Sequence, residues 1–557
     1  MSTSKRFKPD YTCLERLPNE LFVEIFGYLT GVDATYAFSQ LNYRFQNLLL
    51  NYVNTFDFQS VSKLKFDYIT KHHDIQQWQS LCLSNNDQTP GQIRLFSQLY
   101  SPLQYLSQLQ VLSLINIESK LIVEYFSPLI SYDQLISLTI GNICGENMQS
   151  LELPSLKRLV INACKHTDWI MNFPHLEKLE FTIKYNCFHG RNPVTLPTTL
   201  TQLKIFYIEE NDGDNIRTCL RQLSQLTKLI LYDKGSRSPL PNGKIWEEII
   251  QSCLPFLKIF QFCFPFQSYH STSNDMKDVI ASFSTPFYLY EKSWFIRCDI
   301  DCRYSTGGTL YSLPFAFKEM PINITSFDTS LSTLNANDID KIKYNSYEKV
   351  KTLLFNEKCR MPDQGFLSTY VKQLILKTAL PTNWYFTLTN LHHVEFRRTL
   401  HMTSLDFAQF LLNSPQLHSL ILPISVLMKL TDKFTNNTVC DLLSRQIQSL
   451  TISRYFSDEY ELGDVSVRLL TSLVRIFNKS CKHLSLAISA NPNTILPILR
   501  RMKQLRSLHI RYNPWSRSSI NNNPISWIEH APTIIHNSDF IHVTDDCHYY
   551  IWFGNQL

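Results

Sequence analysis

The cysteine thiols are the first candidates in this chain for metal binding or nucleophilic catalysis. Cys298 and Cys302 are separated by three residues, and His189 lies close to Cys187. Neither pair is matched by a second pair at zinc-finger spacing, so structural thiols are the favoured interpretation. The 14 cysteines are expected to stay reduced, because the first ten residues contain no apolar signal segment.

Like the thiols, the histidines and paired carboxylates do not form a convincing catalytic or metal-binding site. His72-His73 and His392-His393 are adjacent, and consecutive strand residues point apart, so they make poor joint ligands. Solvated faces or turns account for the acidic pairs Glu209-Glu210, Glu247-Glu248 and Asp545-Asp546. We find no GxxxxGK(S/T) phosphate loop, HExxH helix or GxSxG elbow. We therefore expect a non-enzyme with no catalytic residue, no metal and no cofactor.

A short phrase, LxxLxL, recurs fourteen times and is the strongest pattern in the chain. Its alternation predicts one short strand per copy, with the leucines buried and the strands stacked in parallel. The copies begin at Leu109, Leu135, Leu156, Leu176, Leu200, Leu226, Leu257, Val350, Val371, Leu391, Leu417, Ile447, Cys481 and Leu505. Helices are expected between some copies, at residues 216–223, 245–253, 405–412 and 465–477.

Residues that flank the middle apolar position of the phrase should share the open face of the sheet. Four successive copies place basic residues there, and they are Arg158, Lys178, Lys204 and Lys228. With strands about 4.8 Å apart, these charges could form a stripe that receives an acidic or phosphorylated segment. The alternative is ordinary solvated lysines, partly offset by Glu180. The second half is polar and weakly charged at Gln373, His393, Glu395, Ser419, Ser449, Thr451, His483 and His509.

Residues 14–50 predict three short helices with more apolar surface than so small a unit can bury. Pro18 suits the first helical position, and Gly31 suits the end of that helix. Asp33 and Asn42 are good N-caps for the second and third helices. A protein partner would explain the apolar excess; a plain helical cap on the following domain is the alternative.

The pattern Leu17-Pro18-x-Glu20-Leu21-x-x-x-Ile25-Phe26-x-x-Leu29 resembles the F-box, and Asp33 continues the motif. Arg44-Phe45 stands where the family usually has a basic residue and Trp. The resemblance implies binding to a Skp-type adaptor, and through it to the cullin and RING subunits of a ubiquitin ligase. The adaptor-binding residues would be Leu17, Pro18, Leu21, Ile25, Tyr28 and Leu29.

Together, the two patterns resemble the F-box/leucine-rich-repeat family. We expect an α/β fold in which a three-helix F-box precedes a leucine-rich-repeat solenoid with parallel strands on its concave face. The expected divisions are an F-box domain at 12–55, a joint and N-terminal cap at 56–105, repeats at 106–262, divergent repeats or a β-rich insertion at 263–349, and repeats with a C-terminal cap at 350–557. A hairpin over residues 540–553 would form that cap.

The composition adds limits to the expected partners. The net charge of +5 is mild and diffuse, which argues against nucleic acid. No stretch of about 18 apolar residues is present, so we expect no membrane span. A cytoplasmic or nuclear substrate receptor that delivers a target protein for ubiquitination is the leading hypothesis. The alternative is an adaptor-binding scaffold with no ubiquitylation target.

Overall fold

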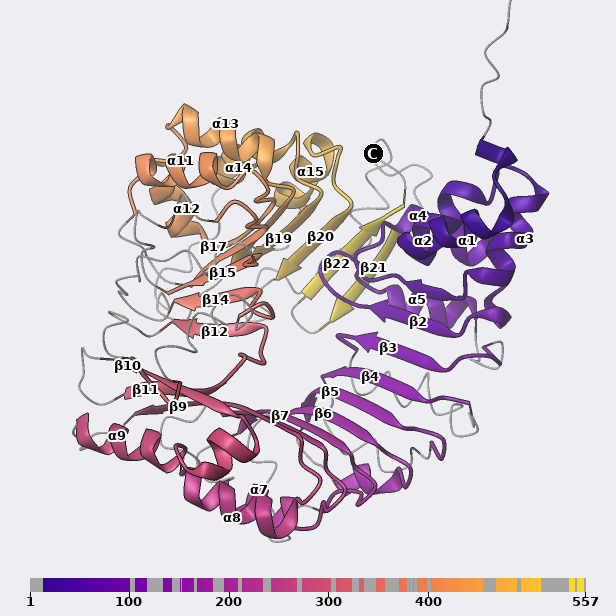
Figure 1. Ribbon diagram of the computed structural model, residues 1–557. Coiled ribbons are helices and arrows are strands. Elements are labelled where there is room, and N and C mark those ends of the chain that lie inside the picture. Colours follow the sequence, from indigo (N-terminus) through magenta and orange to yellow (C-terminus); the bar gives the residue numbers. More distant parts are fainter. Residues whose placement is uncertain are drawn as a thin grey trace, which may run out of the picture.

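Two large sheets and their flanking helices form a mixed α/β architecture in the computed structural model of the chain (Figure 1). The sheets are dominated by parallel pairs, and antiparallel pairs join β9, β11, β10 and β13 in one sheet and β20, β22 and β21 in the other. The structure describes residues 14–100, 106–117, 134–142, 151, 153–164, 168–183, 195–208, 213–233, 242–267, 273–301, 307–322, 330–334, 347–355, 370–377, 380, 384, 388–397, 402–453, 467–487, 492–511, 540–545 and 548–554.

The first sheet has the strand order β1-β2-β3-β4-β5-β6-β7-β8-β9-β11-β10-β13. Its strands are β1 (Thr55–Asp57), β2 (Ser80–Ser84), β3 (Val111–Ile115), β4 (Ser137–Asn142), β5 (Arg158–Cys164), β6 (Lys178–Ile183), β7 (Gln202–Ile208), β8 (Lys228–Asp233), β9 (Ile259–Gln267), β10 (Phe295–Asp301), β11 (Gly307–Leu313) and β13 (Ser330–Ser332).

The second sheet has the order β12-β14-β15-β16-β17-β18-β19-β20-β22-β21. Its strands are β12 (Glu319–Ile322), β14 (Thr352–Phe355), β15 (Gln373–Leu376), β16 (His393–Phe396), β17 (Ser419–Pro423), β18 (Ser449–Ser453), β19 (His483–Ala487), β20 (Ser507–Arg511), β21 (Phe540–Asp545) and β22 (His548–Phe553).

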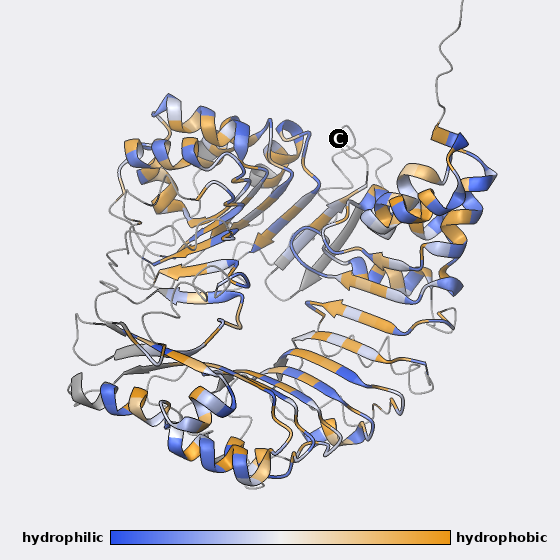
Figure 2. Ribbon diagram, viewed as in Figure 1, coloured by the Kyte–Doolittle hydropathy of each residue, from blue (hydrophilic) through white to orange (hydrophobic). Residues whose placement is uncertain are grey.

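Each of the fourteen LxxLxL phrases contains one of these strands, which confirms the strand prediction. The middle apolar residues are aligned across neighbours, so that Leu138 pairs with Leu159 and Leu159 with Leu179. All three side chains are buried. Polar residues alternate with them along the strands, as Figure 2 shows by the change of hydropathy. Burial of one face therefore fixes the register of the sheet.

Helices lie on the outer side of both sheets (Figure 1). They are α5 (Gln92–Leu99), α7 (Gly213–Leu220), α8 (Gly243–Cys253), α9 (Ser273–Ser282), α11 (Ser404–Asn413), α12 (Ile424–Leu430), α13 (Asn437–Gln446), α14 (Val467–Phe477) and α15 (Pro492–Arg501). Short turns of helix occur at Leu14–Arg16, Ile75–Gln77, Asp168–Asn172 and Phe287–Glu291. The four helices expected from sequence correspond to α7, α8, α11 and α14, with shifted ends.

The N-terminal unit contains α1 (Asn19–Tyr28), α2 (Gly31–Phe38), α3 (Tyr43–Tyr52) and α4 (Lys63–His72). Its cap predictions were partly wrong. Pro18 precedes α1, and α2 is capped by Thr30, whose hydroxyl accepts from the Asp33 amide at 3.0 Å. Asp33 therefore lies in the first turn of α2, where its charge is favourable. Asn42 caps α3 as predicted.

Gly31 begins α2 and does not simply end α1, contrary to the expectation. A Cβ at this position would collide with the carbonyl oxygen of Thr55, so the glycine allows α2 to approach β1 closely. The rings of Phe22 and Phe45 meet edge to face at 4.7 Å in the core of the unit. The helical unit is thus packed directly onto the first strand of the sheet.

Two segments without a clear repeat pattern also contribute strands to the first sheet. Residues 55–57 and 80–84 form β1 and β2, which pair in parallel and begin the first sheet. Residues 263–349 contain β11, which runs antiparallel to β9, and β10, which runs antiparallel to β11. The described part of this segment thus combines the antiparallel strands β11, β10 and β13 with β12, which pairs in parallel with β14.

The C-terminal hairpin β21–β22 was predicted as a cap, and it pairs with β20. It also contacts the other end of the chain, which the sequence did not indicate. The Trp552 ring lies 5.6 Å from the Phe66 ring of α4, and on the neighbouring strand β20, His509 Nδ1 lies 3.3 Å from Asp87 Oδ1. The two sheets consequently form an arc whose ends meet (Figure 1).

Candidate functional site

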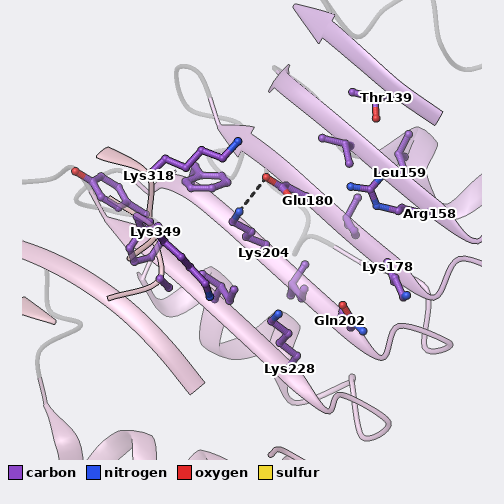
Figure 3. A pocket seen from close by; sticks show the side chains of 18 of the residues that line it. Thr139, Arg158, Leu159, Lys178, Glu180, Gln202, Lys204, Lys228, Lys318 and Lys349 are labelled. Atoms are coloured by element: carbon purple, nitrogen blue, oxygen red, sulfur yellow. Dashed lines mark ion pairs between the residues drawn. The ribbon is translucent and has the colours of Figure 1, made fainter. Parts of the chain in front are cut away.

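A hollow of about 870 Å³ lies on the first sheet and reaches the start of the second. All four basic residues of the predicted stripe line it, namely Arg158, Lys178, Lys204 and Lys228. Figure 3 shows these side chains on adjacent strands, with Lys318 and Lys349 on the opposite side. The hollow therefore brings together charges that the phrase pattern predicted and charges that it missed.

The strand register corrects the arrangement of the stripe. Arg158 pairs with Lys178, Lys178 with Gln202, and Gln202 with Lys228. Lys204 lies two residues further along its strand, in the next row, beside Glu180. Both 202 and 204 flank the middle leucine of their phrase and share one face, so the phrase alone could not choose between them.

Lys204 is also partly neutralised. Its Nζ lies 3.1 Å from Glu180 Oε1, and the ammonium lies 4.5 Å from the centroid of the Phe206 ring. Among the described residues, no carboxylate lies within ion-pair distance of Arg158, Lys178 or Lys228. Arg158 Nη1 donates to the neutral Ser137 hydroxyl at 3.4 Å, so all three side chains keep a positive charge for a ligand on this side of the hollow.

The far side of the hollow comes from the segments before β12 and β14. Lys318, Lys349 and Lys351 add three basic groups there, and Glu319 and Glu348 add two acidic groups. Lys351 follows Val350 of a phrase, but the others lie outside any repeat. Sequence spacing carries no signal that would bring these residues opposite Arg158, because the reversal at β11 sets their position.

Aromatic packing holds the two sides together. Phe317 contacts Tyr232 edge to face at 5.0 Å and Phe206 at 6.0 Å between ring centroids. Tyr232 and Phe317 are 7% and 3% exposed, so their faces are occupied by protein. The lysine that follows Phe317 is therefore placed by a packed core and not by a free loop.

A second hollow of about 520 Å³ lies where the ends of the arc meet. It is lined by the amides of Asn85, Asn86 and Gln88, by the carboxylate of Asp87, and by His393, Ser419, Ser449 and Thr451. Burial, followed by the charges of His418 and His392, lowers the pKa of His393 to about 4. The second sheet therefore contributes polar, weakly charged side chains to this hollow, and Asp87 contributes a carboxylate from the other side.

The other polar residues singled out on the second sheet have internal partners. Glu395 accepts from Arg397 Nε at 2.6 Å, and Gln373 Oε1 accepts from the Thr352 hydroxyl at 3.2 Å. His483 Nδ1 lies 2.9 Å from the Ser507 hydroxyl, and His509 Nδ1 lies 2.8 Å from the Ser485 hydroxyl. They do not line the second hollow.

The helical unit presents a separate apolar surface on α1. Leu21 is 42%, Tyr28 82% and Leu29 39% exposed, and Pro18 is exposed as well. Leu17 and Ile25 are half-buried and pack against the unit's own core. The buried side chains of α1 are Phe22 and Phe26. The six residues predicted to bind an adaptor thus divide into four at the surface and two that support it.

Arg44 positions the chain that enters α1. Its guanidinium donates to the carbonyl oxygens of Glu15 and Leu17, and to Asn19 Oδ1 at 2.8 Å. It also lies over the Phe22 ring at 5.4 Å. One side chain on α3 therefore fixes the Leu17-Pro18 turn against α1. The sequence marked Arg44 only as a member of a motif.

The thiol and imidazole candidates lie in unreactive settings where they are described. Burial raises the pKa of Cys298 to about 12, so its thiol stays protonated. His73 Nδ1 accepts from the Trp78 indole at 3.0 Å, and burial lowers its pKa. Glu247 accepts from the Thr285 hydroxyl at 2.7 Å. His189, Cys187, Cys302, Glu209-Glu210 and Asp546 lie outside the described residues.

Among the described residues, no group of three His, Cys, Asp or Glu side chains is placed to hold a metal ion, and no helix is long and apolar enough to cross a membrane.

Comparisons with known proteins give little further information. No family model matches the chain, and no curated protein matches it. Among solved structures, it aligns with a chain of the Toll–Spatzle complex, described as a molecular hub in Drosophila development and innate immunity. The identity is 14%, the alignment covers 76% of this chain and 40% of that chain, and the TM-score is 0.17. A likeness this weak carries no structural argument.

Proposed function

We propose that this chain is a non-catalytic substrate-recognition subunit of an SCF-type E3 ubiquitin ligase. In this proposal α1–α3 are an F-box that docks on a Skp-type adaptor. The fourteen phrases are leucine-rich repeats of a solenoid that holds a target protein. The observation that carries the proposal is the apolar surface on α1, combined with the F-box spacing of the residues that form it.

The exposure of α1 is what a docking surface requires. The unit buries Phe22, Phe26 and Phe45 in its own core and still leaves Leu21, Tyr28 and Leu29 in solvent. Burial of a leucine side chain is worth about 1.5 to 3 kcal/mol, so a partner that covers this surface gains substantial binding free energy. Grouped exposed apolar side chains are typical of protein-interaction sites.

The chain would act by proximity. The adaptor links it to cullin and RING subunits, and the basic hollow holds the target near a ubiquitin-charged conjugating enzyme. Raising the effective concentration of a target lysine near the thioester requires no catalytic group from this chain. Work in the cytoplasm or the nucleus fits this role.

The test is capture of a purified Skp-type adaptor by Leu21→Ser/Tyr28→Ser. Both side chains are exposed, so the core of the unit should stay intact. We expect adaptor affinity to fall by about tenfold or more, as loss of two central apolar contacts implies. The matched control is Tyr290→Ser/Leu405→Ser, which removes exposed apolar side chains from other elements. Unchanged capture by the α1 variant would overturn the docking proposal.

Affinity capture of the chain from cells distinguishes the ligase role from the scaffold alternative. Adaptor together with cullin in the captured complex supports the ligase role. Adaptor without cullin supports a scaffold that binds the adaptor and delivers no target.

A further inference from the structure

The basic hollow contains more positive charge than its own acidic groups neutralise. Of the described residues that line it, seven are Lys or Arg and three are Glu. Glu180 pairs with Lys204, and Lys351 Nζ donates to the backbone carbonyl of Glu348 at 3.2 Å. Seven basic and three acidic residues leave an excess of four positive charges among the described lining residues, which favours an anionic ligand.

The register sets the spacing of the free cations on the first sheet. Arg158 and Lys178 are neighbours in one row, and Gln202 separates Lys178 from Lys228. With strands about 4.8 Å apart, the three cations lie at about 0, 5 and 14 Å along the row. In an extended peptide, alternate side chains recur about every 6.7 Å, so three of them span about 13 Å. Long, flexible lysine side chains can absorb the remaining difference.

The opposite side of the hollow is rigidly held. Tyr347, two residues before Lys349, shares a hydrogen bond of 3.0 Å with the Tyr311 hydroxyl, which donates to Asp299 at 2.6 Å. Asp299 is itself paired with Arg297 at 2.8 Å. Lys318 is placed by the packing of Phe317. The lysines on both sides of the hollow are therefore attached to ordered elements, which lowers the entropy cost of binding.

The lining favours an acidic peptide over single-stranded nucleic acid. Base binding needs exposed aromatic faces on which bases stack. Tyr232 and Phe317 are buried, and the ammonium of Lys204 already lies over Phe206. Cations without stacking platforms match side-chain anions carried on an extended backbone.

We propose that the hollow binds an extended acidic segment of a target protein, with anionic side chains at alternate positions. Its first anions pair with Arg158, Lys178 and Lys228, and Lys318 and Lys349 approach from the other side. Carboxylates and phosphates share this chemistry. That the segment belongs to a ubiquitylation target rests on the proposed function; the anion site itself does not.

Peptide binding to the full chain tests the site directly. The probe is a fluorescein-labelled glycine-rich peptide with aspartate at three alternate positions, and fluorescence polarisation reports its affinity. We expect the aspartate peptide to bind, an asparagine analogue not to bind, and a phosphoserine analogue to bind more tightly if phosphate is the better ligand. Tighter binding of the aspartate peptide would assign the site to carboxylates, and equal affinity would show that the site accepts either anion.

The variant Lys178→Gln/Lys228→Gln should lower the affinity of the acidic peptide by about tenfold or more. Glutamine already occupies the equivalent row position at residue 202, so the strand tolerates it. The matched control, Lys244→Gln/Lys503→Gln, removes the same net charge from exposed lysines outside the hollow. An equal loss in both variants would show a net-charge effect and would overturn the site.

Two further outcomes would contradict the proposal. One is no binding of either acidic peptide. The other is tighter binding of an oligothymidylate that depends on Lys178 and Lys228, which would assign the hollow to nucleic acid. Adaptor capture is measured on the same preparations. Failure of the peptide site with adaptor capture intact would leave the docking proposal standing, and the reverse result would leave the peptide site standing.

Discussion

The ammonium of Lys204 and the carboxylate of Glu180 lie 3.1 Å apart on neighbouring strands of the first sheet. This pair occupies the row next to Arg158 and Lys178 and divides the basic residues into one compensated lysine and three available cations. Glu180 therefore limits the positive potential of the hollow.

Removing that carboxylate should strengthen anion binding. In Glu180→Gln, we expect the affinity for the acidic peptide to rise by about threefold to tenfold, since a nearby negative charge is lost. The measurement is fluorescence polarisation at low salt. Glu177→Gln is the matched control, because Glu177 pairs with Lys157 outside the hollow. An unchanged affinity in Glu180→Gln would contradict the role given to Lys204.

Arg44 should contribute more to stability and to adaptor binding than its partial exposure suggests. Arg44→Lys keeps the charge but loses the fork that reaches both backbone carbonyls. We expect the free energy of unfolding to fall by about 1 to 2 kcal/mol and adaptor capture to weaken. Urea unfolding and adaptor titration measure the two effects. Arg445→Lys, in an exposed ion pair on α13, should change neither; equal behaviour of the two variants would refute the positioning role.

The contact between the ends of the arc should be a main contributor to stability. Trp552 is fully buried, and Trp552→Ala should destabilise the chain by about 3 to 5 kcal/mol. Thermal unfolding measures the change. Tyr290→Ala, at an 80% exposed aromatic residue, should alter stability by less than about 0.5 kcal/mol. A similarly small effect of Trp552→Ala would show that the ends do not support each other.

Stability should also fall in mild acid because of two histidines on the second sheet. Burial lowers the pKa of His393 and His483 to about 4, with neighbouring positive charges as the second cause. In the unfolded chain the two imidazoles become protonated below about pH 6.5, whereas in the folded chain they stay neutral until the pH falls to about 4. The stabilisation is therefore complete above about pH 6.5 and is lost as the pH falls toward 4.

Urea unfolding at about pH 7.5 and about pH 5 should detect this loss, which we expect to be roughly 1 to 3 kcal/mol for the two groups. The double variant His393→Gln/His483→Gln should show a smaller difference between the two pH values. If it loses as much stability as the parent chain, the loss comes from other titrating groups.

Periodicity gave the strands and the buried rows with good accuracy, because alternation and burial depend on local spacing. Leu159 and Leu179 could be placed against each other from their phrases alone. The residues that face Lys178 across the hollow could not be placed from the sequence. Lys318 comes to lie there because the chain reverses direction at β11. Exposure of Leu21 beside buried Phe22 was also ambiguous, because both belong to one wide apolar stripe.

The meeting of the two ends has a consequence during synthesis. Phe66 is translated long before Trp552, so the α4 region leaves the ribosome without its final packing partner. Domains whose contacts join residues far apart in the sequence fold slowly, and they expose apolar surface until these contacts form. Truncation before β22 should therefore leave aromatic surface uncovered near the helical unit, where chaperones or quality control could bind it. The contact between Phe66 and Trp552 can therefore form only after synthesis has passed β22.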